Sequence, residues 1–399
     1  MTMSCCPIRH GAPARAGLLA LLTLAAACAP DPTQPTARDP GVDQAIVVTG
    51  APPIPAIQSV VDVGTIVQNP VIYGRDGNFS GRIGNRSVWT FGDTPLSAPN
   101  ANGLNWDDNT LSWTKDLNAA DGITLTNDIT DASGNPGEFM PYTAFETQYN
   151  YDHDSRHCTA QPCGAEYAMW PSAVVADPAR ARALIFYGEI WRIAGQSTWT
   201  NIGGGIAVGT GTGTFTRPIL NPGNPDPTLM WDSTEVQFTG GAATKGDTLF
   251  SFGCTAGILN MHCRIGRVLL ADALVKSAWE YHHSDGSWSN NATTADTVFL
   301  GGAAANTIVY SPYLKLWVLF YSRVFSDDVL MRVAYDPWGP WSGWRKVFTA
   351  RPGWNGNTSY AAQPHVEYAQ QNGKVQYVTY AHTIGFLRMD QPIAQISFR

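Results

Sequence analysis

The chain has 399 residues, of which 14% are charged, and it contains 39 glycines, 27 prolines and 14 tryptophans. So many turn-forming and aromatic residues with so few charges are typical of a turn-rich β protein of one large or two ordinary domains. The net charge is -7, and no cluster of lysine and arginine could follow a phosphate backbone, so nucleic acid is excluded as a partner.

Residues 1–27 are expected to be a signal peptide. Arg9 and Arg15 supply a positive region, and the stretch AGLLALLTLAAAC that follows is apolar but too short to span a bilayer. The small residues before Cys28 resemble a bacterial lipobox, which implies cleavage before Cys28 and a lipid on that cysteine. Ordinary cleavage after an Ala-x-Ala site is the alternative, because Leu24 lies further from the cysteine than a lipobox leucine would.

A spacer and a folded domain follow the signal. Residues 28–56 are rich in Pro, Asp and Thr, a composition typical of a semi-rigid linker. Residues 57–399 then form the domain. We expect an exported protein that is held at the bacterial cell envelope, at the outer membrane or cell surface, by its lipid anchor alone, and that is secreted if Cys28 carries no lipid.

Aromatic strand-like segments recur through the domain and predict its fold. The segments are WTFGD (89–93), LIFYGE (184–189), LFSFGC (249–254), WVLFYS (317–322) and VQYVTYAH (375–382). Each is the second run of a hairpin-like pair, and the pattern repeats roughly every 65 residues after a longer first interval. We place an insertion in that interval, within residues 101–170. The repeat suits four-stranded blades, so we predict an all-β, five-bladed β-propeller, with a β-sandwich as the alternative.

The first hairpin, YGRDGNFSGRIGNRSVWTFGDT, brings two aspartates into register. If Gly84-Asn85 is a two-residue turn, Asp76 faces Asp93 across the ladder, with their Cβ atoms about 5 Å apart on one face. Gly77 then opposes Gly92, so the neighbouring pair of the ladder has no side chains beside the two carboxyl groups. Paired carboxylates repel each other, and one of them typically responds with a raised pKa, which a general acid needs. The alternative is that both are solvated turn residues.

The repeat carries these two positions to the other hairpins. In the other four hairpins, Asp76 corresponds to Ser172, Glu235, Asn306 and His365. Asp93 corresponds to Glu189, Cys254, Arg323 and His382. Equivalent positions of a propeller converge on its axis, so we expect a polar funnel in which five of these residues bind substrate: Glu189, Glu235, Asn306, Arg323 and His365. The alternative for each is a hydrogen-bonded residue at the end of a strand.

Two local cysteine pairs lie in the domain. Cys158 and Cys163 enclose one short loop, and Cys254 and Cys263 enclose another. In an exported protein we expect each pair to form a disulfide. A zinc site is the alternative, but it would need four converging ligands, and the nearby histidines are not at a familiar finger spacing.

The stretch RDGNFSGRIGNRSVWTFGDT, with GEFMPYTAFETQYN (137–150) and VAYDPWGPWSGWRKV (333–347), resembles the family called domain of unknown function 4185. The likeness spans about residues 57–398. Characterised members of that family look like glycoside hydrolases that cut D-arabinan, and the layout is similar to five-bladed propeller glycosidases of the arabinanase and invertase kind. The resemblance implies a furanose-acting glycosidase with Asp76 and Asp93 as its catalytic pair.

Glycoside hydrolysis needs one carboxylic acid to protonate the leaving oxygen and one carboxylate to act as nucleophile or base, and Asp76 and Asp93 can supply both. We therefore expect a glycoside hydrolase that cleaves furanosyl linkages of an arabinan-like polysaccharide, as a monomer without cofactor or metal. Tryptophans in loop-like stretches could stack on sugar rings: Trp106, Trp113, Trp170, Trp231 and Trp354. The alternative function is a non-catalytic surface lipoprotein whose propeller binds a glycan or a protein.

Overall fold

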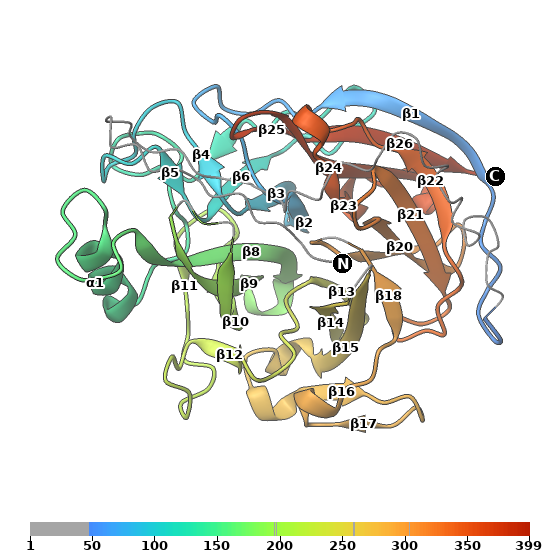
Figure 1. Ribbon diagram of the computed structural model, residues 1–399. Helices are drawn as coiled ribbons and strands as arrows, with labels where there is room; N and C mark the ends of the chain where they lie inside the picture. Colours follow the sequence, from blue (N-terminus) through green and yellow to red (C-terminus); the bar gives the residue numbers. More distant parts are fainter. Residues whose placement is uncertain (1–47, 195, 197, 258–259, 303) are drawn as a thin grey trace, which may run out of the picture.

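The computed structural model describes residues 48–399 except residues 195, 197, 258–259 and 303. The predicted signal peptide (1–27), Cys28 and most of the predicted spacer (28–56) lie outside the described residues, so they stay predictions. Apart from one two-stranded ribbon, the strands of the domain form five antiparallel sheets around an axis (Figure 1). The fold is a five-bladed β-propeller, as the repeated hairpins predict.

The first four blades follow one another along the chain. Blade 1 contains β2 (Phe79–Ile83), β3 (Arg86–Phe91), β6 (Thr110–Thr114) and β7 (Asn127–Asp128). Blade 2 contains β8 (Ala165–Asp177), β9 (Arg182–Ile193), β10 (Trp199–Gly209), β11 (Phe215–Thr216) and β12 (Leu229–Asp232). Blade 3 contains β13 (Gly241–Lys245), β14 (Thr248–Ala256), β15 (Met261–Leu269), β16 (Glu280–His282), β17 (Trp288–Ser289) and β18 (Phe299–Gly301). Blade 4 contains β19 (Ile308–Ser311), β20 (Leu316–Ser322), β21 (Asp328–Ala334) and β22 (Arg345–Thr349).

Blade 5 combines both ends of the domain and closes the ring. Its strands are β23 (Tyr360–Pro364), β24 (Val375–Gly385), β25 (Arg388–Asp390), β26 (Pro392–Phe398) and the N-terminal β1 (Ile57–Thr65). β1 pairs antiparallel with β26, from Ile57 opposite Phe398 to Thr65 opposite Pro392, and Figure 1 shows the blue β1 beside the red β26. The last sheet is therefore completed by the first strand.

The aromatic segments that predicted the blades form the second strand of each one. Their marker residues are all buried: Phe91 in β3, Tyr187 in β9, Phe252 in β14, Tyr321 in β20 and Tyr380 in β24. In β20 every residue from Leu316 to Ser322 is buried, so side chains on both faces pack against neighbouring blades. Continuous apolar runs of this kind are typical of strands that are covered on both faces.

The longer first interval holds additional elements. A short ribbon pairs β4 (Thr94–Pro95) with β5 (Trp106–Asp107), and α1 (Ala144–His153) lies between blades 1 and 2 in the chain. Thr143 and Glu146 form a capping box that fixes the start of α1. Among the described residues, no helix combines the length and apolar character needed to cross a membrane. Short 3₁₀ turns complete the fold: η1 (Pro178–Arg180), η2 (Leu270–Asp272), η3 (Lys276–Ala278), η4 (Ala292–Thr294), η5 (Trp354–Gly356), η6 (Val366–Tyr368) and η7 (Gln371–Gly373).

Both predicted disulfides are confirmed. Cys158 is bonded to Cys163 in the loop after α1, and Cys254 is bonded to Cys263. The second bond joins directly opposed residues of β14 and β15. Because all four sulfur atoms belong to these two disulfides, they are not zinc ligands.

The first strands of the blades lie next to one another around the axis, since β2 contacts β8, β8 contacts β13, and β13 contacts β19. Each first strand runs from one end of the propeller to the other, and the second strand returns. We call the end at which the first strands begin the entry end. Asp76 precedes β2 and Asp93 follows β3, so both aspartates lie at the entry end of blade 1.

Candidate active site

The hairpin of β2 and β3 pairs Asp76 with Asp93. The pairs from Phe79 opposite Thr90 to Ile83 opposite Arg86 have the predicted register. Beyond the strands, the Asp76 N–H donates to the Asp93 carbonyl at 2.9 Å, and the Gly92 N–H donates to the Asp76 carbonyl at 2.8 Å. Asp76 thus opposes two residues at once, which is a bulge, and the ladder extends to both aspartates.

Asp76 lies among neutral hydrogen-bond donors. The Tyr360 hydroxyl donates to its Oδ1 at 2.7 Å, and the Gly77 N–H donates to the same oxygen at 2.6 Å. Burial raises the pKa of Asp76 to about 6; the Tyr360 hydrogen bond opposes the shift, and the negative charge of Asp93 adds to it. Asp76 can therefore hold a proton in mildly acidic solution.

Asp93 lies among different donors. It is 7% exposed, and its Oδ2 accepts a hydrogen bond from Nη1 of Arg192 at 2.7 Å. Its Oδ1 accepts from the indole Nε1 of Trp170 at 3.1 Å. Trp170 also fills the space beside Gly92, where its ring lies 3.4 Å from the position that a Cβ would take. The bare stretch of ladder expected at Gly92 is thus covered by an indole.

Arg192 gathers three carboxylates from three segments. Besides Asp93, it donates to Glu166, its cross-strand partner on β8, at 2.6 Å, and to Asp108, which lies between β5 and β6. Burial alone would lower the pKa of Arg192, but Asp93, Asp108 and Glu166 raise it well above its usual value. The guanidinium is therefore always charged, and it joins blade 1 to blade 2 at the entry end.

A further acid extends this network. The Tyr142 hydroxyl lies 2.8 Å from Oδ2 of Asp108 and 3.1 Å from Oε1 of Glu138. Burial raises the pKa of Glu138 to about 8, and the charge of Asp107 contributes to the shift. Glu138 therefore binds a proton more readily than an ordinary glutamate does.

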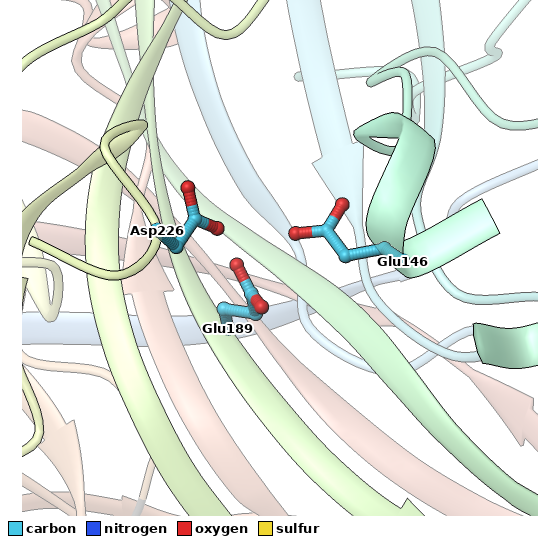
Figure 2. A group of neighbouring side chains, drawn as sticks. All are labelled: Glu146, Glu189 and Asp226. Carbon is cyan, nitrogen blue, oxygen red and sulfur yellow. The ribbon is translucent and has the colours of Figure 1, made fainter. Parts of the chain in front are cut away.

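Glu189, a predicted substrate-binding residue, lies in a separate buried cluster. Figure 2 shows its carboxyl group with those of Glu146 from α1 and Asp226, and these are the acids of the described chain that are close enough together to bind a metal ion. Arg217 donates to Glu146 at 2.5 Å, to Glu189 at 2.8 Å and to Asp226 at 3.1 Å. An arginine therefore supplies the positive charge of this cluster.

The other predicted substrate-binding residues also have partners of their own. Glu235 pairs with Lys276 at 2.6 Å, and the Asn306 side chain accepts from the Gly302 N–H at 3.0 Å. Arg323 lies over Trp344, with its guanidinium carbon 5.9 Å from the ring centroid.

His365 is fully buried, with its ring nitrogens 2.6 Å from the hydroxyls of Ser80 and Thr379. Burial lowers the pKa of His365 to about 3, so the ring is neutral. None of these contacts joins the five residues to the aspartate pair, and their roles in binding stay predictions.

The structure adds residues that the sequence did not single out. Arg192, Tyr360, Asp108 and Glu166 all belong to the network around the aspartate pair. Extending the register of the β8–β9 hairpin would have placed Arg192 opposite Glu166 at the entry end, because these residues are directly paired. Asp108 and Tyr360 come from a loop and from another blade, and no local pattern marks them.

Replacement of Arg192 by methionine tests its role in holding the site together. Arg192→Met should lower the free energy of unfolding by about 3–5 kcal/mol, because three largely buried carboxylates lose their shared cation. Arg351→Met is the matched control, since the ion pair of Arg351 with Asp62 is exposed and should contribute about 0–1 kcal/mol. Urea unfolding of both variants measures the difference, and equal losses would contradict the assignment.

Comparison with proteins of known structure shows the same fold. A Bacteroides ovatus protein described as a hydrolase is 12% identical, with a TM-score of 0.53 over 82% of this chain and 86% of that chain. A family 117 glycoside hydrolase of Zobellia galactanivorans is 10% identical, with a TM-score of 0.47 over 85% and 89% of the two chains. The GH43_1 enzyme of Xanthomonas citri is 12% identical, with a TM-score of 0.46 over 84% and 89%. The first of these likenesses concerns the fold.

The sequence comparisons define the family. No curated protein matches this sequence at a significant level. The family model called domain of unknown function (DUF4185) matches residues 71–382, which include both aspartates, the Arg192 network and strands of all five blades. The chain therefore belongs to the DUF4185 family, as the signature around Asp76 and Asp93 indicates.

Proposed function

We propose that this protein is an exported glycoside hydrolase that cleaves furanosyl linkages of arabinan-like polysaccharides, with Asp76 and Asp93 as its catalytic pair. The observation that carries the proposal is the contrast between two neighbouring carboxyl groups. Asp76 is partly buried among neutral donors, and its pKa is raised to about 6, whereas Asp93 is paired with the guanidinium of Arg192. One carboxyl group held by neutral donors beside a second one paired with a cation is an arrangement that suits the acid and the carboxylate of glycoside hydrolysis.

Each aspartate then has a distinct role. Asp76 in its acid form donates its proton to the glycosidic oxygen as the bond to the leaving sugar breaks. Asp93, as the carboxylate, acts on the anomeric carbon directly or through a water molecule. Arg192 and Trp170 keep the Asp93 carboxylate in place, and Tyr360 does the same for Asp76.

The substrate class rests on the sequence signature. The stretch around Asp76 and Asp93 resembles that of proteins that look like D-arabinan hydrolases, and the Bacteroides ovatus protein of the same fold is described as a hydrolase. Incubation of the purified domain with arabinans, galactans and fructans, followed by analysis of released sugars, tests the class directly. We expect release from arabinan.

Asp76→Asn and Asp93→Asn test the catalytic pair. Each removes a charge and keeps the shape, so hydrolysis of arabinan should fall by about 10²–10⁴-fold, and the double variant should lose little more than either single one. Asp285→Asn is the matched control, because it removes an aspartate from an exposed turn of blade 3. If both site variants unfold while their folded fraction keeps full turnover, the aspartates are turn formers.

The raised pKa of Asp76 predicts a pH dependence. Because the acid form is required, kcat/KM should fall about tenfold per pH unit above pH 6. Asp76 also affects stability. Its pKa is higher in the folded than in the unfolded protein, so the free energy of unfolding falls as pH rises from 4 to 6. Asp76→Asn should therefore gain stability relative to the wild type over this window, by up to about 3 kcal/mol. A flat rate profile to pH 8 would exclude Asp76 as the acid.

We also propose that the protein is exported and lipid-anchored through Cys28. The charged and apolar segments before Cys28 support this proposal. Cys28→Ser in the full chain should move the protein from the membrane fraction to the soluble fraction, measured by fractionation and immunoblotting. A wild-type protein that is already soluble would contradict the anchor.

A further inference from the structure

An exposed tryptophan lies beside the aspartate pair. Trp199 begins β10, is 57% exposed, and is directly opposite Arg192 in the β9–β10 ladder. Arg192 in turn binds Asp93. The strand pairing thus places a large apolar side chain, much of it in contact with solvent, next to the residue that holds the Asp93 carboxylate.

A second contact ties Trp199 to the same carboxylate. Its ring meets that of Trp170 edge to face, with centroids 5.3 Å apart and an interplanar angle of 71°. The Trp170 N–H donates to Asp93, and the Trp170 ring lies over Gly92. Trp170 therefore contacts both Trp199 and the candidate catalytic group.

The edge-to-face contact restricts the orientation of the Trp199 ring, and 57% of the residue stays exposed. Two aromatic rings in this arrangement stabilise each other, so Trp199 is held in one orientation although it is largely exposed. A fixed indole face offers a flat, electron-rich surface to C–H groups. The C–H-bearing face of a sugar ring matches that surface, while the sugar hydroxyls stay free for the carboxylates and for water.

We propose that Trp199 is the stacking platform of a sugar-binding subsite beside Asp93, in which it holds a pentofuranose unit of the polysaccharide next to the linkage that is cut. This inference rests on the proposed function and adds to it a residue that positions substrate. The energy of binding this sugar unit positions the polysaccharide so that the linkage to be cut lies at Asp76 and Asp93.

Binding measured separately from cleavage tests the platform. In an Asp76→Asn background, which keeps Asp93, Trp170 and Arg192, calorimetry with D-arabinan oligosaccharides of increasing length gives the affinity. Adding Trp199→Ala should weaken binding on the order of tenfold for oligosaccharides long enough to reach the platform. Trp199→Phe, which keeps a flat face, should recover most of the affinity. In the active protein Trp199→Ala should raise KM and leave kcat almost unchanged.

Tyr335→Ala is the matched control. Tyr335 is also an exposed aromatic residue, at 55%, but it follows β21 at the end of the propeller opposite the entry end, so its removal should not change the affinity. Arabinan cleavage and oligosaccharide binding that are equal in the wild type and Trp199→Ala would overturn the platform and leave the proposed function standing. A wild type that neither cleaves nor binds these sugars would overturn both.

Discussion

The antiparallel pairing of β1 with β26 is the contact on which the rest of the structure depends. It joins residues 57–65 to residues 392–398 in one sheet, so the ring of blades is closed, with β26 paired on both sides and β1 as the outer strand of blade 5. Closure places blade 5 against blade 1. The Tyr360 hydroxyl of β23 can then reach Asp76, and His365 can reach Ser80. The contacts of Asp76 with blade 5 therefore depend on closure of the ring.

The contacts of Asp93 depend on the junction of blades 1 and 2. Arg192 reaches from β9 to Asp93 at the end of β3 and to Asp108 in the following loop. A buried cation among several acids fixes their positions, because leaving any of the carboxylates unpaired would be costly. Asp93 is bound from this side and Asp76 from blade 5, so two adjacent carboxyl groups receive different partners. Their chemical difference follows from which blade each one faces.

Features of the fold that depend on local chain geometry can be predicted from the sequence. The Gly84-Asn85 turn sets the hairpin register, so the pairing of Asp76 with Asp93 follows from turn geometry and is confirmed. The blade number follows from repeated strands, and the disulfides follow from short loops that can close.

Positions transferred between blades depend on the bulges and loop lengths of each blade, which no local rule determines. His365 and Asn306 each form hydrogen bonds with nearby polar groups, and their roles in binding stay predictions. The Arg192 network joins segments about 100 residues apart in the chain, and no local pattern encodes such contacts.

Carbon-13 NMR titration of the aspartate carboxyl groups tests the central claim most directly. In the wild-type domain the Asp76 carboxyl should titrate near pH 6, since burial and the charge of Asp93 both raise its pKa. In Asp93→Asn the Asp76 pKa should move down, because a neighbouring negative charge is gone. An Asp76 carboxyl that titrates near pH 4 in both proteins would show that the two groups do not interact, and would contradict their assignment as an acid and carboxylate pair.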